Sequence, residues 1–144
     1  MRRNVKSLPL DISDKDWLIQ TNVSYEDNQN LKHVGRWSLS VANTEQNETW
    51  SKLRKLYKTG ALPGCKYIMS STAASPQKFG VILAFFDKSK DETYIKECGQ
   101  MLLDKLNYKP PDGVTGIYYK SKTVHPEKKF LYRLDLPPGD SDSD

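Results

Sequence analysis

The residues best suited to chemistry in this sequence lie near its C-terminus, between positions 116 and 130. The stretch GIYYKSKTVHPEKKF contains two adjacent tyrosines, four lysines and one of the two histidines of the chain. Lysine side chains neutralise phosphate groups, and a tyrosine ring can stack on a nucleobase. The stretch therefore predicts a rim that binds the phosphates of RNA or of a nucleotide. The alternative is a strand followed by a solvated basic loop.

The candidate ligand-binding residues extend from this stretch into the strand predicted after it. They are Lys120, Lys122, His125, Lys128, Lys129 and Arg133, with Tyr119 beside them. Strand side chains alternate between two faces, so only one of Tyr118 and Tyr119 can face a ligand, and the sequence leaves open which one. Nearby lysines disfavour the protonated form of His125, so its neutral imidazole is available to hydrogen-bond a phosphate. The alternative for His125 is an exposed loop residue without a role.

Tryptophan supplies a second candidate surface, since an indole ring stacks well on a nucleobase. Trp37 and Trp50 fall on the apolar phases of an alternating segment and of a helical segment, which predicts that both pack in the core. Trp17 lies outside any regular period. It is therefore the tryptophan that we retain as a candidate for stacking a base.

Motifs for catalysis or for a bound metal are absent from the sequence. It contains no glycine-rich phosphate loop, no G-x-S-x-G nucleophile motif and no H-E-x-x-H zinc motif. Cys65 and Cys98 stand 33 positions apart, which is unlike a zinc-site spacing and typical of a reducing compartment. We predict a protein without metal or cofactor that is better suited to binding than to catalysis. An enzyme that acts on phosphate esters with His125 and a lysine remains an alternative.

Charge is unevenly distributed along the chain. The net charge is +4, but residues 135–144 hold four Asp and no basic side chain, which leaves +8 on residues 1–134 from 22 basic and 14 acidic side chains. Such a body is compatible with an anionic partner such as RNA, a nucleotide or a phosphoprotein, and equally with a solvated basic surface. No apolar run approaches the roughly 18 residues that span a bilayer, and the N-terminus lacks the apolar core of a secretory signal. We expect a cytoplasmic or nuclear monomer that contacts no membrane.

Hydrophobic periodicity predicts the elements that must position the candidate residues. Residues 35–42 alternate apolar and polar side chains, which is typical of a strand with one buried face. Apolar residues of 46–58 recur at three- or four-residue steps and predict an amphipathic helix that ends before Gly60. Residues 65–71 predict a further strand. The wholly apolar run 79–86 predicts a central strand that is buried on both faces.

A second helix is predicted between residues 88 and 108. Ser89 and Glu92 fit a capping box at its start. Its inner stripe is formed by Ile95, Cys98, Met101 or Leu102, and Leu106. Two more strands follow, over 114–121 and 129–135.

These elements predict one α+β domain, in which two helices cover one face of a mainly antiparallel sheet. The domain is expected over residues 35–136. Residues 1–34 are expected to form an irregular segment that packs on the core, within which 16–21 can form a short strand. Residues 137–144 are expected to form a disordered acidic tail.

Spaced aromatic and aliphatic positions from Trp17 to about Leu134 resemble the basophilic-leukemia-expressed protein family. The segments that carry this resemblance are GRWSLSV, ETW, GALPGCKYIMSST, VILAFFDKSKDETYIKECGQMLLDKL and GIYYKSKTVH. The resemblance implies a curved sheet with the fold of cap-binding translation initiation factor 4E, to which LPGCKY and KLNYKPPDGVTGIYYKSKTV are also similar. That factor holds the cap between two loop tryptophans, whereas this sequence has no tryptophan after Trp50.

The resemblance also implies a role for the C-terminal cations. The factor grips phosphates with basic residues near its last strands, and the nearest counterparts here are Lys120, Lys122, Lys128, Lys129 and Arg133. Our leading hypothesis is a non-enzymatic binding module for RNA or a phosphorylated nucleotide. The second hypothesis is a protein-interaction adaptor that engages its partner through a helix face or an exposed sheet edge.

Overall fold

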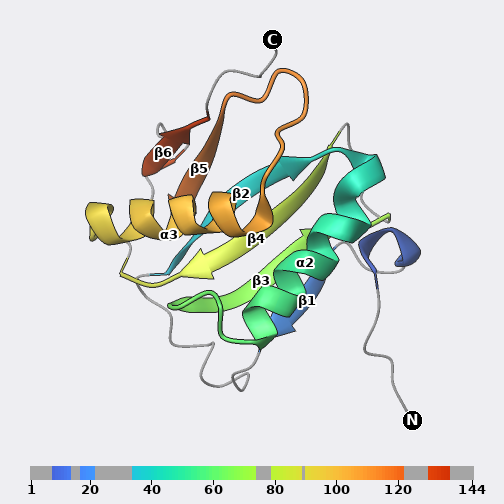
Figure 1. Cartoon of the computed structure of the whole chain (residues 1–144), viewed down its shortest axis with the longest axis horizontal. Helices are drawn as coiled ribbons and strands as arrows, with labels where there is room; N and C mark the ends of the chain where they lie inside the picture. The colour runs from blue at the N-terminus through green and yellow to red at the C-terminus, as the bar shows by residue number, and fades with distance from the viewer. Residues whose placement is uncertain are drawn as a thin grey trace.

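Six strands and two long helices make up the described part of the computed structural model, which covers residues 8–13, 17–21, 34–73, 79–88, 90–121 and 130–136. The elements are η1 (Pro9–Asp11), β1 (Trp17–Thr21), β2 (Gly35–Val41), η2 (Asn43–Glu45), α2 (Gln46–Lys58), β3 (Cys65–Ser71), β4 (Gly80–Phe86), α3 (Glu92–Leu106), β5 (Gly116–Ser121) and β6 (Tyr132–Asp135). The strands form one sheet in the order β1-β3-β4-β2-β5-β6, and all neighbouring pairs are antiparallel. Both helices lie on the same face of this curved sheet (Figure 1). The predicted α+β class and its layer arrangement are confirmed.

Strand β2 lies between β4 and β5 and sets the two faces of the sheet. Its buried residues alternate with half-buried ones, as the sequence pattern predicts. Trp37 of β2 is opposite Ala84 of β4 and Tyr119 of β5, and directly opposite residues share a face. The apolar residues of three strands therefore meet beneath the helices. The intervening residues, which include Arg36, point to the helix-free face.

Helix α2 begins and ends at the predicted residues. It buries Trp50, Leu53 and Tyr57 against the sheet, and it also buries the polar side chain of Gln46. Gln46 Nε2 donates to Ser70 Oγ at 3.1 Å and to the carbonyl oxygen of Ser71 at 2.7 Å. A buried amide with these partners holds the first turn of α2 to the end of β3.

Helix α3 begins later than the predicted capping box requires. Its N-cap is Asp91, whose Oδ1 accepts a hydrogen bond from the Tyr94 backbone N–H at 3.1 Å. The prediction that Ser89 caps the helix is therefore wrong, and Ser89 itself lies outside the described residues. The buried stripe includes Leu102 rather than Met101, and it contains Gly99, at which Trp37 approaches the helix backbone.

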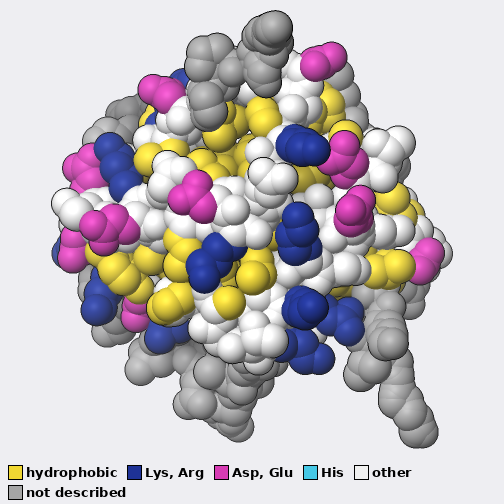
Figure 2. All heavy atoms as spheres, viewed as in Figure 1, with side chains coloured by type: hydrophobic (Ala, Val, Ile, Leu, Met, Phe, Trp, Pro, Cys, Tyr) yellow, Lys and Arg dark blue, Asp and Glu magenta, His cyan; other side chains and the backbone are white. Residues whose placement is uncertain are grey.

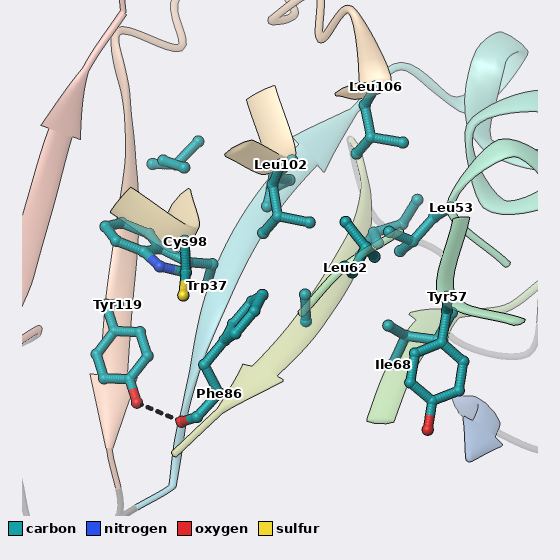
Figure 3. Close-up of a cluster of buried hydrophobic side chains, with 14 of the residues drawn as sticks. Trp37, Leu53, Tyr57, Leu62, Ile68, Phe86, Cys98, Leu102, Leu106 and Tyr119 are labelled. Carbon is teal, nitrogen blue, oxygen red and sulfur yellow. Dashed lines mark hydrogen bonds between the residues drawn. The ribbon is translucent and has the colours of Figure 1, made fainter. Parts of the chain in front are cut away.

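The hydrophobic core lies between the helices and the sheet (Figure 3). Its largest fully buried side chains include Trp37, Trp50, Tyr119 and Phe86. Complete burial of an apolar side chain of this size contributes roughly 1.5–3 kcal/mol relative to leaving it exposed. The predicted core positions of Trp37 and Trp50 are confirmed.

The N-terminal segment contributes a strand to the sheet. Strand β1 pairs with β3 along its whole length, so the predicted short strand is present. The short helix η1 is attached to the first turn of α2, because the Leu10 N–H donates to Asn47 Oδ1 at 3.0 Å. The predicted acidic tail of residues 137–144 lies outside the described part of the chain. No helix within the described ranges is long and apolar enough to cross a bilayer.

The two core tryptophans allow a matched stability test. Trp37 Nε1 donates to the Ile95 carbonyl oxygen at 2.9 Å, whereas Trp50 Nε1 is buried without a partner among the described residues. We expect Trp37→Phe to lower the free energy of unfolding by about 3 kcal/mol. The loss for Trp50→Phe is expected to be smaller than that for Trp37→Phe by about 1–2 kcal/mol, since the unpaired buried N–H that it removes is itself unfavourable. Urea unfolding followed by circular dichroism measures both values. Equal losses would contradict the difference in pairing.

Candidate functional site

The helix-free face carries a row of four side chains that runs across four neighbouring strands. Tyr67 of β3 is opposite Phe85 of β4, Phe85 is opposite Arg36 of β2, and Arg36 is opposite Lys120 of β5. Directly opposite residues share a face, so these four side chains form one line, which we call the cross-strand row. Neighbouring strands lie about 4.8 Å apart, so the row is roughly 14 Å long.

The first half of the cross-strand row is aromatic. The rings of Tyr67 and Phe85 stack with their centroids 4.1 Å apart and their planes 13° from parallel. Phe85 is buried in a small cluster with Val34 and Leu83 on this face, while Tyr67 remains partly exposed. Each ring covers one face of the other, and Tyr67 is the ring of this pair that remains partly accessible.

The second half of the cross-strand row is cationic. Among the described residues, neither Arg36 nor Lys120 forms an ion pair or a side-chain hydrogen bond. Burial raises the pKa of the Tyr67 hydroxyl, and the nearby Arg36 guanidinium partly offsets this effect. The positive charge of Arg36 thus lies close to the aromatic end of the row. Two adjacent cations with no counter-ion in the part of the chain that the structure describes favour an anionic ligand.

A second line of side chains runs beside the row and ends at Arg133. Tyr118 is opposite Ser38 on one side and Arg133 on the other, and its ring contacts Phe130 with the centroids 4.8 Å apart. The Arg133 guanidinium lies 5.3 Å from the Tyr118 ring centroid, and its Nε is 2.7 Å from Asp135 Oδ1. Because Asp135 offsets its charge, Arg133 is a weaker candidate for binding phosphate than Arg36 or Lys120.

Tyr119 lies on the opposite face, and its predicted contact with a ligand is wrong. The side chain is fully buried, and its hydroxyl donates to the Phe86 carbonyl oxygen at 2.7 Å and accepts from the Gly35 N–H at 2.7 Å (Figure 3). Burial raises the pKa of this hydroxyl well above its usual range, so it stays neutral and able to donate. Because strand side chains alternate, Tyr118 is the member of this adjacent pair that lies on the helix-free face.

The structure brings some of the predicted site residues together and separates another. Lys120 and Arg133 share the helix-free face with Tyr118, whereas Trp17 lies on β1, at the far edge of the strand order. Strands β1 and β5 are separated by three others, roughly 19 Å in all. Strand β1 is the neighbour of β3, but Trp17 is four residues, roughly 13 Å, along β1 from Thr21, the residue opposite Tyr67. A role of Trp17 in stacking a base stays a prediction. Lys122, His125, Lys128 and Lys129 lie outside the described residues.

Sequence reasoning missed three members of the cross-strand row. Arg36 and Tyr67 occupy the polar phases of their strands, a signal that marks an exposed face without saying what lies beside it. Phe85 was expected only as a buried residue. Their proximity depends on the placement of β2 between β4 and β5, which the order of elements along the chain does not reveal.

The cysteines do not have the properties of nucleophiles. Burial raises the pKa of the Cys65 thiol to about 12 and also raises that of Cys98, so both thiols are protonated at neutral pH. In the ranges that the structure describes, no three side chains of His, Cys, Asp or Glu lie close enough together to hold a metal ion.

Two hollows on the helical side are lined by described residues. A hollow of about 480 Å³ beside the C-terminal half of α2 is lined by Leu8, Ser51, Arg54, Lys55, Lys58 and Thr59. Figure 2 shows Lys and Arg side chains gathered over this part of the helical face. A smaller hollow of about 210 Å³ lies between the first turns of α2 and the end of α3, and it is lined by acidic and basic side chains alike.

The sequence matches no protein-family model and no curated protein. Membership in the basophilic-leukemia-expressed protein family therefore stays a prediction.

Solved structures of translation initiation factor 4E do resemble the chain. Ascaris suum eIF4E-3 in complex with m7G cap superposes with a TM-score of 0.61 at 19% identity, over 84% of this chain and 68% of that protein. Caenorhabditis elegans eIF4E-3 in complex with the 4E-binding protein Mextli gives 0.56 at 16% identity, over 71% of this chain and 59% of that protein. Schistosome eIF4E complexed with m7GpppG and 4E-BP superposes with a TM-score of 0.54 at 12% identity, over 71% of this chain and 59% of that protein. The chain thus spans about three fifths to two thirds of the length of these proteins, and it has an eIF4E-like fold.

Proposed function

We propose that this protein binds RNA or a phosphorylated nucleotide on the helix-free face of its sheet and catalyses no reaction. The observation that carries this proposal is the cross-strand row, which is aromatic at Tyr67 and Phe85 and cationic at Arg36 and Lys120. A nucleotide has the same polarity, since it joins a flat base to phosphate groups. Solved proteins of this fold in complex with cap nucleotides add support.

In this binding mode the base stacks on the Tyr67 ring and the phosphates lie over Arg36 and Lys120. Stacking on an aromatic ring contributes about 1–3 kcal/mol per base and tolerates any base sequence. Lys122, Lys128 and Lys129 follow Lys120 in the sequence and add positive charge to this segment, and His125 lies among them in the sequence. Arg133 orients the Tyr118 ring beside the phosphates.

A paired charge-removal experiment tests the proposal. The variant Arg36→Gln/Lys120→Gln is expected to bind a labelled, 5′-phosphorylated single-stranded RNA oligonucleotide at least about tenfold more weakly, because each charge-assisted phosphate contact contributes roughly 1.5–3 kcal/mol. Loss of two contacts on a single strand also lowers the slope of log affinity against log salt by about 1.4. Fluorescence anisotropy titrations at several salt concentrations measure both effects.

The matched control removes the same charge from the helical side. Lys105→Gln/Lys109→Gln replaces two exposed lysines and is expected to bind RNA nearly as well as the wild type. Equal losses in the two double variants would show that only net charge matters and would contradict a site on the helix-free face. An undetectable affinity of the wild-type protein at low salt would overturn the proposed function itself.

A second candidate function is that of a protein-interaction adaptor, which the basic hollow at α2 favours. The hollow presents Arg54, Lys55 and Lys58 on the helical side, away from the cross-strand row. Two solved structures of this fold contain a 4E-binding protein. A protein partner captured from cell extract would favour this function over nucleotide binding if its binding persists after nuclease treatment and in the Arg36→Gln/Lys120→Gln variant.

A further inference from the structure

The two edges of the sheet differ in how they are protected from pairing with another strand. Edge strand β6 has four residues, and the charged side chains of Arg133 and Asp135 are exposed on it. Short length and exposed charge are the usual devices that block an edge. Edge strand β1 has five residues, WLIQT, and contains no charge, no proline and no bulge. In the described part of the chain no strand covers its outer edge.

Strand β1 also carries most of the exposed large apolar side chains of the described residues. These are Leu10 at 37% exposure, Trp17 at 36% and Ile19 at 56%, and the last two belong to β1. Ile19 is opposite Met69 and therefore continues the apolar part of the helix-free face outward. An unprotected edge with exposed apolar side chains is a template for strand addition.

We propose that the outer edge of β1 pairs antiparallel with β1 of a second copy of this chain, around a two-fold axis at Ile19. In this register Ile19 is opposite the partner's Ile19, Trp17 is opposite the partner's Thr21, and Leu18 is opposite the partner's Gln20. The strand can pair with a copy of itself, because it has no charged side chain that the two-fold axis would place next to a like charge. The result is one continuous sheet built from two six-stranded halves.

Backbone geometry permits this register in either hydrogen-bonding phase. An antiparallel pair alternates between hydrogen-bonded and non-hydrogen-bonded residue pairs, and a two-fold axis can pass through either kind. Because the contact is isologous, it closes after two copies and does not continue into a fibre. A foreign peptide would gain the same backbone bonds, but β1 offers no charge with which to select one.

The expected dimer is weak. Two five-residue strands and the side chains beside them bury less than the roughly 1,600 Å² of a standard interface, so a dissociation constant in the micromolar range is expected. This inference does not depend on the proposed function, and it is the alternative to the monomer expected from the sequence. If both hold, the helix-free faces of two copies lie side by side.

Sedimentation velocity over a range of protein concentrations tests the proposal. The wild-type protein is expected to shift from monomer to dimer as concentration rises. Ile19→Lys places like charges against each other at the two-fold axis and is expected to weaken the dimer at least about 100-fold. Leu10→Lys is the matched control, since it changes an exposed apolar residue outside β1 and leaves the dimer intact. A wild-type protein that stays monomeric at all concentrations, or a dimer that survives Ile19→Lys, overturns the proposal.

A mixing experiment separates a lost contact from a lost fold. Ile19→Lys and Ile19→Glu are each expected to be monomeric alone and to form a mixed dimer when combined, because the two-fold axis sets position 19 against itself. Differently tagged copies of the two variants, analysed by co-purification, report the mixed species. Folded variants that form no mixed dimer would contradict the proposed register.

Discussion

Replacing Gly35 by Ala is expected to lower the free energy of unfolding by about 3 kcal/mol or more. A Cβ at this position would clash with the Lys120 carbonyl oxygen and would lie 2.6 Å from the Tyr119 ring. Movement of either neighbour would cost free energy, because the Lys120 carbonyl belongs to the β5 backbone. The Tyr119 side chain is fully buried, and its hydroxyl both donates and accepts a hydrogen bond. Urea unfolding followed by circular dichroism measures the loss.

Gly60→Ala is the matched control for this substitution. Gly60 has a φ of 78° and nothing within 4 Å of its Cβ position, so alanine there is opposed only by backbone conformation. That conformation costs an L-residue about 1–2 kcal/mol. Gly35 has no positive φ, so its loss is purely steric. A smaller loss for Gly35→Ala than for Gly60→Ala would contradict the close approach of β2 and β5.

Replacing Tyr119 by Phe is expected to lower the free energy of unfolding by about 2–3 kcal/mol. The hydroxyl joins the Gly35 N–H to the Phe86 carbonyl oxygen, and these two residues are register partners on β2 and β4. Its removal leaves a buried donor and a buried acceptor unpaired, and each unpaired group costs about 1–3 kcal/mol before relaxation. Chemical unfolding of the variant and the wild type gives the difference.

Tyr118→Phe provides the control, because Tyr118 is partly exposed and its hydroxyl has no hydrogen bond among the described residues. It is expected to change stability by no more than about 0.5 kcal/mol. Comparable losses in the two variants would contradict the assignment of Tyr119 to the core and of Tyr118 to the helix-free face.

The pH dependence of stability supplies a second measure of the Tyr119 network. Burial raises the folded-state pKa of Tyr119 above its unfolded value of about 10, so its contribution is complete below about pH 10 and falls as the pH rises further. The wild-type protein should therefore lose stability more steeply above pH 10 than Tyr119→Phe does. Cys65 and Tyr108, whose pKa values burial raises to about 12, contribute equally to both proteins.

Local patterns predicted most elements because their physical causes are local. The three- to four-residue spacing of apolar side chains placed α2 at the residues where the structure has it. The unbroken apolar run predicted a strand buried on both faces, and β4 has nearly every residue buried. The start of α3 was missed because Ser89 and Asp91 are both good caps, and only the observed Asp91 bond to the Tyr94 N–H distinguishes them.

The candidate site was less predictable, since it depends on contacts between distant segments. The sequence identified Lys120 and Arg133 as candidates by their charge and by their place on the last strands. It offered Trp17 as a separate candidate for stacking a base, without showing that three strands separate β1 from β5. It did not identify Arg36 as a candidate, because a single arginine in an alternating strand indicates a binding site only when its neighbours on the adjacent strands are known.

The sequence by itself determined the element types, most of their approximate limits and the buried faces of both helices and of β2, because periodicity and turn residues act within a few positions. Only the tertiary structure decided the strand order, and with it which tyrosine lies on the helix-free face, which cations lie together and which strand is left at the edge. Strand order depends on pairing between residues up to 86 positions apart, such as Gly35 and Ser121. Backbone hydrogen bonds are alike for every candidate partner strand, so side-chain packing selects the partner. That is why Arg36 and Lys120, 84 positions apart in the chain, meet in the structure.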